Sequence, residues 1–394
     1  MFDIAFEQEW LIVTTLVLLV SYLSVTWVRE YYILQKAVQK IPVRIHVNGS
    51  RGKSSVTRLI AAGLRAGGLK TLAKTTGTSP RIIDETGEDL FIHRLRRPTI
   101  SEQIRMLKDF AKENPDVVVM ECMAVQPQYQ WISEQRMVKS TIGVITNIRP
   151  DHLPEMGPLM EDVTRSLGNS IPFNGKLVTT KSDLSNILSE ISDSRNTSIE
   201  VVEEDEVTPE TVNQFPYLEH RENIAVALKV CELAGVKREA ALKGMVESKP
   251  DPGALSFTEL KFGEKKNTFI NALAANDPDS TLMAWEICLE RVKRSGICVF
   301  LNTRDDRRYR TMQMLDMVEH TIKPDALVIR GDNLPSLKKY ENLFQLKVFS
   351  NSTKPEDAAG YFSKFDDYLI FAAGNMVGWG QEFVNYLMKN HKHG

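Results

Sequence analysis

The sequence predicts an α/β protein with a central domain that holds a phosphate-binding loop and a second, smaller Rossmann-like domain, preceded by one transmembrane helix. Apolar β-branched runs alternate with helix-length amphipathic segments, which is typical of parallel sheets with crossover helices. Residues 249–253 contain two prolines and one glycine and interrupt this alternation. Residues 10–28 carry no charge. These three observations separate an N-terminal anchor from two folded domains.

The uncharged stretch 10–28 is long enough to cross a bilayer. As a helix it spans about 28 Å, close to the thickness of the hydrocarbon core. The flanking residues favour a retained anchor over a cleaved signal peptide, and a buried core helix is the other alternative. Because Arg29, Lys36 and Lys40 follow the stretch, we expect a single-pass protein of the cell membrane with cytoplasmic catalytic domains.

The domains follow from the positions of the apolar runs. Residues 1–40 are assigned to the anchor and a linker, 41–250 to the central domain and 254–394 to the second domain, and we expect a truncation that starts near Lys40 to remain soluble and to bind nucleotide. Parallel strands are expected in both domains. The predicted strands are 43–49, 116–122, 141–147, 176–180 and 199–202 in the central domain, and 297–302, 325–331, 346–350 and 367–375 in the second.

The composition excludes several classes of protein. With 42% apolar and 25% charged residues among 394, the chain is globular rather than disordered or fibrous. The net charge of −2 provides no overall field to hold nucleic acid. The cysteines follow neither CxxC nor metal-finger spacing, so we expect core thiols in a reducing compartment at Cys122, Cys231, Cys288 and Cys298.

The clearest local motif is a glycine loop between the first predicted strand and a helix-like segment. Two glycines permit backbone N–H groups to approach phosphate oxygens, and a helix N-terminus adds positive potential. In such loops the lysine reaches the β- and γ-phosphates and the first hydroxyl is a Mg²⁺ ligand. A fortuitous glycine turn is the alternative. The loop residues are Gly49, Ser50, Arg51, Gly52, Lys53, Ser54 and Ser55.

This loop and several later motifs resemble the Mur ligase superfamily, whose loop reads GxxGK[ST]. Glu121 ends the strand in VVVMECMAV, and Asn147 and His152 lie in TNIRPDHLPEMG, in the place and order of the Mg²⁺-binding motifs of that superfamily. His220 and Asn223 in EHRENIAVAL resemble its adenine-side helix. Within the superfamily, the segments NGSRGKSSVTRL, KTTGTSPR, ECMAVQPQYQ, PDPGA and NALAANDPDS are similar to the ATP-dependent poly-γ-glutamate synthases.

The resemblance implies a ligase that uses ATP to activate a carboxylate as an acyl phosphate. It implies Lys53, Glu121 and His152 as catalytic residues, and Mg²⁺ bound by Ser54, Glu121 and His152. A structural histidine is the alternative for His152, because imidazole is an uncommon Mg²⁺ ligand. Nucleotide is expected to contact residues 49–55 together with Asn223, Arg304 and Asp305, although a solvated charge run is the alternative for the last two.

Two positions depart from the superfamily pattern. Many members carry a modified lysine after the motif histidine, but here that region reads TRSLGNSIPF and contains no lysine. The acidic pair of the C-terminal motif is replaced by Asn271 and Ala272, ahead of Asn276 and Asp277, so ribose contacts are not carried over to this stretch.

Two loops are candidates for substrate contacts. The hydroxyl-rich loop of Thr75, Thr76 and Thr78 resembles a substrate-side loop, with an ordinary turn as the alternative. The glycine-rich segment 373–380 ends the last predicted strand and is a candidate for closing on the acceptor.

The predicted function is polymerisation of glutamate through its γ-carboxylate, with ATP and Mg²⁺. The expected partners are glutamate, the growing chain, the membrane and additional membrane subunits of a synthase and export complex, but not nucleic acid. One alternative is another Mur-type ligase that acts on folate or a cell-wall precursor. The alternative of a different class is a membrane-tethered nucleotide-binding switch or assembly ATPase.

Overall fold

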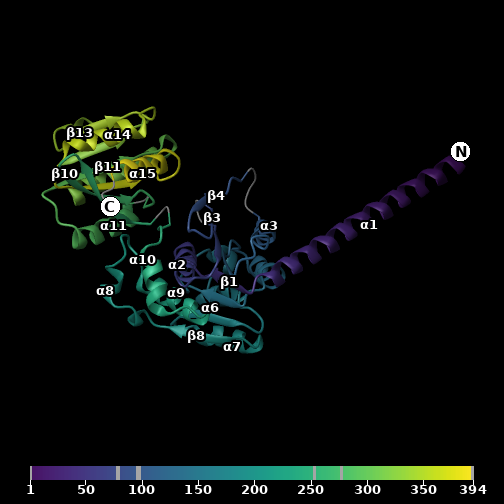
Figure 1. Cartoon of the computed structure of the whole chain (residues 1–394). Helices are drawn as coiled ribbons and strands as arrows, with labels where there is room; N and C mark the ends of the chain where they lie inside the picture. Colours follow the sequence, from purple (N-terminus) through teal and green to yellow (C-terminus); the bar gives the residue numbers. More distant parts are fainter. Residues whose placement is uncertain (1, 77–79, 95–98, 252–253, 276–277, 392–394) are drawn as a thin grey trace. The chain divides into compact units, whose positions relative to one another are not determined.

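The chain forms two α/β units. The computed structural model describes residues 2–76, 80–94, 99–251, 254–275 and 278–391. The first unit comprises Met1–Pro209 and His220–Lys249, and the second comprises Glu210–Glu219 and Pro250–Gly394 (Figure 1). Three residues singled out in the sequence, Thr78, Asn276 and Asp277, lie outside the described residues.

An eight-stranded sheet forms the centre of the first unit, in the order β4-β3-β2-β5-β1-β6-β7-β8. Six of these strands pair in parallel, in the spatial order β2, β5, β1, β6, β7 and β8. Strands β3 and β4 continue the sheet antiparallel at the edge next to β2. The strands are β1 (Val43–Asn48), β2 (Thr71–Thr75), β3 (Arg81–Ile83), β4 (Asp89–Phe91), β5 (Val117–Glu121), β6 (Ile142–Ile145), β7 (Lys176–Thr180) and β8 (Ser198–Val202).

The five strands predicted for this sheet are confirmed, and β2, β3 and β4 are additional. Strand β2 escaped prediction because Lys74 interrupts its apolar run, and β3 and β4 are too short to show a periodic pattern.

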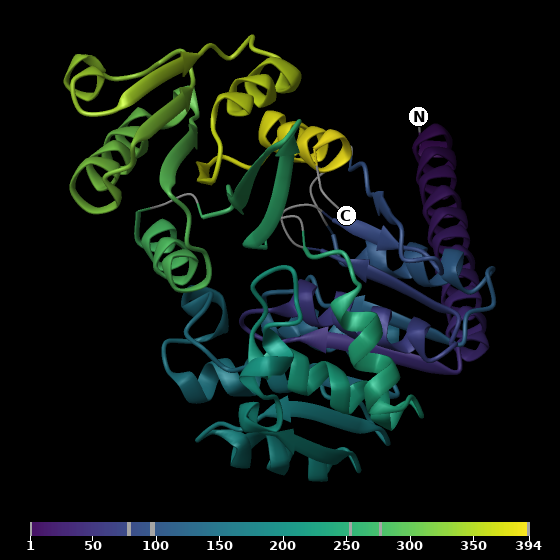
Figure 2. The ribbon, with the colours of Figure 1, turned by 60° about the vertical axis from the view of Figure 1, so that its left-hand side comes forward.

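Helices cover this sheet. The phosphate-loop helix α2 packs against α9 and α10, and the three labels lie together in Figure 1. In Figure 2, α9 and α10 are the teal-green helices in front of the first sheet. Close approach is possible because Gly63 and Gly244 lack side chains: a Cβ at Gly63 would lie 2.8 Å from the Cys231 sulfur. The helices are α1 (Phe2–Lys40), α2 (Lys53–Ala66), α3 (Ser101–Phe110), α4 (Pro127–Ile132), α5 (Leu153–Met156), α6 (Met160–Gly168), α7 (Ser185–Ser194), α9 (Arg221–Leu233) and α10 (Arg238–Val246), with a π-helix η1 (Ser133–Val138) and a 3₁₀ turn η2 (Glu204–Glu206).

The N-terminal helix α1 corrects one prediction, because residues 29–40 are not a linker. The helix continues without interruption to Lys40. Its last turns bury Leu34, Ala37 and Val38 in a core cluster that includes Leu107 of α3. The apolar part of α1, in contrast, is exposed and is the one stretch among the described residues that is long and apolar enough to cross a membrane. One continuous helix therefore joins that stretch to the core of the first unit.

The second unit is built on a six-stranded sheet in the order β13-β12-β11-β14-β10-β9. Its strands are parallel except for the antiparallel hairpin of β9 and β10. The strands are β9 (Ser256–Phe262), β10 (Lys265–Ala272), β11 (Gly296–Asn302), β12 (Ala326–Arg330), β13 (Gln345–Phe349) and β14 (Tyr368–Gly374). The other elements are α8 (Pro209–Val212), α11 (Pro278–Arg291), α12 (Arg308–Met317), α13 (Lys338–Glu341), α14 (Pro355–Tyr361) and α15 (Trp379–Asn390), with the short turns η3 (Asp305–Arg307), η4 (Val318–Ile322) and η5 (Phe362–Lys364).

The four strands predicted for this unit are confirmed, and the hairpin is an addition. The predicted range 41–250 also needs one correction, because residues 210–219 group with the second unit. The reason is strand pairing: Tyr217 forms a β-bridge with Ser256, and the Leu218 amide donates to the carbonyl of Leu255 at 2.7 Å. The four cysteines are buried free thiols, as predicted.

Candidate functional site

The predicted phosphate loop leaves the carboxyl end of β1 and enters α2. Gly49 and Gly52 have φ angles of +132° and +79°, in the region that favours glycine. A Cβ at Gly49 would lie 2.1 Å from the Thr146 hydroxyl oxygen, and one at Gly52 would lie 2.6 Å from the Asn223 amide oxygen. Both glycines are therefore required by backbone conformation and by space.

The loop is held by residues that follow β6. Thr146 donates its hydroxyl hydrogen to the Arg51 carbonyl at 2.6 Å, and the Asn147 amide oxygen accepts from the Arg51 backbone N–H at 3.0 Å. Ser50 exchanges hydrogen bonds with the backbone of Arg149. Asn147 was predicted in a Mg²⁺-binding motif, but its amide in this structure positions the loop. Thr146 was not predicted, and only its place at the end of an apolar run could have indicated it.

Lys53 begins α2 with its ammonium folded over the loop. Its nitrogen lies 2.7 Å from the Gly49 carbonyl oxygen and 3.1 Å from that of Ser50. No acidic residue occupies the first turn of α2. The free N–H groups at the helix N-terminus and the ammonium thus present positive potential at one place, which suits a phosphate chain.

Ser54 and Glu121 lie side by side, although 67 positions separate them. The Ser54 hydroxyl donates to the Glu121 carboxylate at 2.9 Å because β1 and β5 are neighbours in the sheet and end at the same edge. Glu121 is almost fully buried and also accepts the Thr76 backbone N–H at 2.6 Å. A hydroxyl and a carboxylate are hard oxygen donors, and Mg²⁺ needs few protein ligands because it keeps several waters. This pair therefore fits a Mg²⁺ ion.

His152 is placed less specifically. It precedes α5 with a φ of +46°, and its side chain is half exposed. Its ring nitrogens lie 3.9 Å from Asp151 and 4.0 Å from Glu155. Within the described residues, no three His, Cys, Asp or Glu side chains gather closely enough to form a metal cluster. The role of His152 in binding metal stays a prediction.

A buried ionic cluster adjoins Glu121 and was not predicted. Lys74 on β2 is fully buried, and its ammonium lies 2.9 Å from the Glu102 carboxylate, which also pairs with Arg94 at 2.7 Å. Burial opposes ionisation of Glu102, but the two cations outweigh it and hold its pKa at about 2. Burial likewise lowers the pKa of Lys74, and Glu102 counteracts this only in part. In the sequence, Lys74 within the apolar run of β2 is the feature that could have indicated a buried ion pair.

Helix α9 brings its first turn to the loop. Asn223 is buried directly against Gly52, and Glu222 accepts a hydrogen bond from Arg149 at 2.7 Å. His220 precedes the helix in extended conformation. Of the two predicted adenine-side residues, Asn223 thus adjoins the phosphate loop within the first unit.

In the second unit, Asp305 holds neighbouring loops together. Its carboxylate accepts the backbone N–H of Asn333 at 3.1 Å and the side-chain amide of Asn351 at 2.6 Å. Arg304 is exposed and pairs with Asp306 at 2.7 Å. Both residues lie at the carboxyl end of β11, as expected. Their contact with nucleotide stays a prediction, and the structure gives Asp305 a loop-positioning role.

The glycine-rich segment after β14 is fixed by Asn302. The Asn302 side-chain amide donates to the Asn375 carbonyl at 2.6 Å, and a Cβ at Gly374 would lie 2.3 Å from the Asn302 carbonyl oxygen. Arg330 supports Asn302 by donating to its amide oxygen at 3.1 Å and lies over the Trp379 ring.

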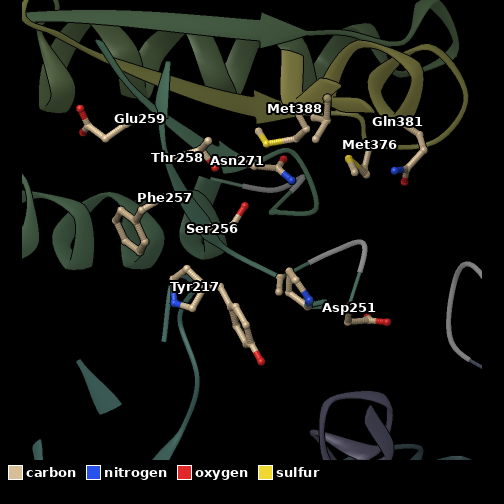
Figure 3. Close-up of a pocket in the computed structure, with 14 residues that line it drawn as sticks. Tyr217, Asp251, Ser256, Phe257, Thr258, Glu259, Asn271, Met376, Gln381 and Met388 are labelled. Carbon is tan, nitrogen blue, oxygen red and sulfur yellow. The ribbon is translucent and has the colours of Figure 1, made fainter. Parts of the chain in front are cut away.

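Asn271 lines a cavity of about 380 Å³ in the second unit. Figure 3 shows Ser256, Thr258 and Asn271 on the β9–β10 hairpin, facing Met376 and Gln381 from the segment around α15. The Asn271 amide oxygen accepts the Leu273 N–H at 3.3 Å. The residue that replaces an acidic group of the superfamily motif thus supports its own turn.

Comparisons with known proteins agree with the geometry of both units. Residues 47–232 match the family described as the Mur ligase middle domain, and residues 257–390 match the poly-gamma-glutamate synthase CapB C-terminal domain. The chain is 35% identical over 370 residues to the capsule biosynthesis protein CapB of Bacillus anthracis, covering 90% of this chain and 78% of that protein. The chain belongs to the CapB family.

Two further likenesses extend this result. The PGA synthase CapB of Bacillus subtilis strain 168 is 36% identical over 315 residues, which cover 78% of this chain and 79% of that protein. A folylpolyglutamate synthase from Thermotoga maritima has a TM-score of 0.63 at 14% identity, with 91% of this chain and 93% of that chain covered. The latter shows that this chain shares its fold with a folylpolyglutamate synthase.

For this CapB-family chain, the substitution Glu121→Gln is expected to raise the Mg²⁺ concentration needed for half-maximal ATP turnover by about 10- to 100-fold. An amide keeps the shape and can still accept a hydrogen bond from Ser54, but it is a neutral and poorer ligand than a carboxylate. Excess Mg²⁺ should partly restore turnover. The exposed Glu161→Gln is the control. An unchanged Mg²⁺ requirement would show that Glu121 does not bind Mg²⁺ and has only a structural role.

The ionic cluster predicts a pH dependence of stability. The pKa of Glu102 in the folded protein is depressed from 4.5, so its contribution is fully present above about pH 4.5 and is lost as the pH falls towards 2. We expect Glu102→Gln to lower the free energy of unfolding by about 1–2 kcal/mol at neutral pH, after allowance for solvent screening. The difference from wild type should shrink below pH 4.5 in chemical denaturation, whereas the exposed Glu113→Gln should show no such trend.

Proposed function

We propose that this protein is a membrane-anchored, ATP-dependent amide ligase that polymerises glutamate through its γ-carboxylate. Membership of the CapB family supports the reaction class. The observation that carries the proposal is the arrangement at the carboxyl edge of the first sheet, where Lys53 lies over a glycine loop and Ser54 contacts Glu121.

The residues suit a reaction in two transfers. The γ-carboxylate of glutamate attacks the γ-phosphorus of ATP, which forms an acyl phosphate and releases ADP. The amine of the second glutamate, or of the growing chain, then attacks the acyl carbon, loses a proton and displaces phosphate as the amide forms. Lys53 and the N–H groups of the loop neutralise and orient the phosphate oxygens during the first transfer.

Ser54 and Glu121 would hold Mg²⁺, which when bound neutralises charge on the transferred phosphoryl group. Thr76 supports this arrangement because its backbone N–H fixes the Glu121 carboxylate. The buried pair of Lys74 and Glu102 holds α3 against the strand that precedes Thr76. Nucleotide contacts by Asn223, Arg304 and Asp305, and metal binding by His152, belong to the same proposal.

Anchoring to the membrane is proposed from α1. Its apolar stretch is fully exposed in the folded chain, unlike the core helix of a soluble protein, and basic residues follow it. Additional membrane subunits for synthesis and export would then meet the enzyme at the bilayer.

The experiment that tests the function is ADP release by the purified protein with ATP and Mg²⁺ in the presence of single amino acids. Stimulation by glutamate alone, with formation of γ-linked product, is expected. Stimulation only by a folate or cell-wall precursor would favour another Mur-type ligase. Hydrolysis that does not depend on any amino acid would favour a nucleotide switch or assembly ATPase.

A further inference from the structure

A hollow of about 730 Å³ lies in the first unit where α1 meets α3, α4 and η1. Its walls are largely aromatic and apolar, and they come from segments far apart in the chain. The residues that matter are Trp27, Tyr31 and Tyr32 of α1, Ile104 of α3, Trp131 of α4 and Arg136 of η1.

The hollow is separate from the phosphate loop. It borders the core cluster in which α1 and α3 pack against Val118 and Met120 of β5. Successive side chains of a strand point to opposite faces, so Glu121 points to the other face of the sheet, where α2 lies. Side chains in the hollow can therefore be changed without contact to the residues that bind phosphate.

The hollow directly continues the apolar stretch of α1. From residue 28 to residue 34 the helix rises by about 9 Å, and the headgroup layer of a bilayer is about 5–7 Å thick on each side. Trp27 and Tyr32 are 73% and 63% exposed. Tryptophan and tyrosine are the residues that collect at this level of a membrane. If α1 spans the bilayer, the opening of the hollow lies among lipid headgroups.

The charges around the hollow favour an anion. Arg136 is exposed and lies over the Trp131 ring at 5.3 Å, and among the described residues it has no ion-pair partner. The acidic residue on the wall, Glu30, forms an ion pair with Lys108 at 3.5 Å, which offsets its negative charge. Arg29 on α1 is also exposed. A guanidinium held over an aromatic wall suits a phosphate with an apolar body attached.

We propose that this hollow binds an anionic phospholipid of the cytoplasmic leaflet, with the phosphate beside Arg136 and the upper acyl chains against the aromatic walls. The proposal rests on the membrane anchoring proposed above. Its consequence is that α3 and α4 contact the bilayer directly, so the first unit is held against the membrane at two places rather than attached only by α1.

The test uses the full-length protein reconstituted into vesicles of phosphatidylcholine, with or without phosphatidylglycerol brominated on the upper acyl chain. Bromine quenches only nearby tryptophan. Trp10→Phe and Trp27→Phe remove the tryptophans of α1, and comparison with a further Trp131→Phe variant isolates the emission of Trp131. A chain that carries Trp10→Phe and Trp131→Phe but keeps Trp27, compared with the chain that lacks all three, isolates the emission of Trp27. Brominated phosphatidylcholine in place of phosphatidylglycerol separates general lipid contact from recognition of the anionic lipid.

We expect brominated phosphatidylglycerol to quench Trp131 severalfold more than brominated phosphatidylcholine does. Arg136→Glu should remove this preference, Arg136→Lys should retain part of it, and the exposed Lys243→Glu on α10 should leave it unchanged. Glutamate-stimulated ADP release, measured in the same vesicles, reports the ligase function independently. Thermal unfolding verifies that each variant is folded.

Three results would overturn the proposal. Equal quenching by both lipids would show contact without anion recognition. Quenching of Trp27 but not Trp131 would show that the helix spans the membrane while the hollow faces water or another protein. No quenching of Trp27 would show that α1 does not span the membrane. Glutamate-stimulated ADP release in that case would still support the ligase function.

Discussion

Replacing Lys53 with alanine is expected to reduce glutamate-dependent ATP turnover by roughly 10²- to 10³-fold, the loss typical of removing one preorganised donor from a reacting oxyanion. The ammonium is held over the loop by the carbonyl oxygens of Gly49 and Ser50, so the charge is positioned before the nucleotide arrives. Turnover at saturating ATP and Mg²⁺ is the measurement.

The folded state of Lys53→Ala should change little. Alanine is a good helix former at the start of α2, and the loop keeps its hydrogen bonds to Thr146 and Asn147. Lys243→Ala, which removes an exposed charge from α10, is the matched control and should be fully active. Near-normal turnover in a folded Lys53→Ala variant would refute the assignment of the phosphate loop.

Truncation of α1 is expected to leave a stable protein when the chain starts at Arg29 and an unstable one when it starts at Ile41. A chain that starts at Arg29 keeps Leu34, Ala37 and Val38, which are buried in the core cluster. A chain that starts at Ile41 loses them, and burial of the leucine and valine alone contributes about 3–6 kcal/mol. That amount is comparable with the total stability of many domains, about 5–15 kcal/mol.

The shorter chain should therefore aggregate or melt at a much lower temperature, contrary to what the sequence suggested for a truncation near Lys40. It also loses the hydrogen bond from Lys139 to Gln35, at 2.6 Å, and the carbonyl of Val38 that accepts from Arg44. Thermal unfolding and nucleotide binding of the two truncated proteins provide the comparison. Equal melting temperatures would show that the end of α1 contributes only an anchor.

The sequence was most informative where local rules decide the structure. Glycines at positions 49 and 52 are needed by a turn with positive φ, and apolar alternation on either side specifies β1 and α2. The same reasoning placed Glu121 at the end of a buried strand. Short strands such as β3, and β2 with its buried Lys74, could not be found in this way because their patterns are too short or are interrupted by charge.

The tertiary structure decided which of these residues meet. Glu121 contacts Ser54 only because β1 and β5 are paired in the sheet, and the charge of Lys74 is matched inside the unit only because α3 brings the Glu102 carboxylate to it. These contacts join positions tens of residues apart, and local propensity does not specify them.

Composition and motifs by themselves determined that this protein has an apolar N-terminal helix, a phosphate loop and two α/β units, because each depends on neighbouring residues. Only the tertiary structure decided that the helix ends inside the first core, that residues 210–219 join the second unit, and that Asp305 positions loops. The physical reason is that burial of a side chain and pairing of strands depend on segments far apart in the sequence, which meet only in the folded chain. A segment such as 29–40 is as compatible with an exposed linker as with a core helix until Leu107 and its neighbours cover it.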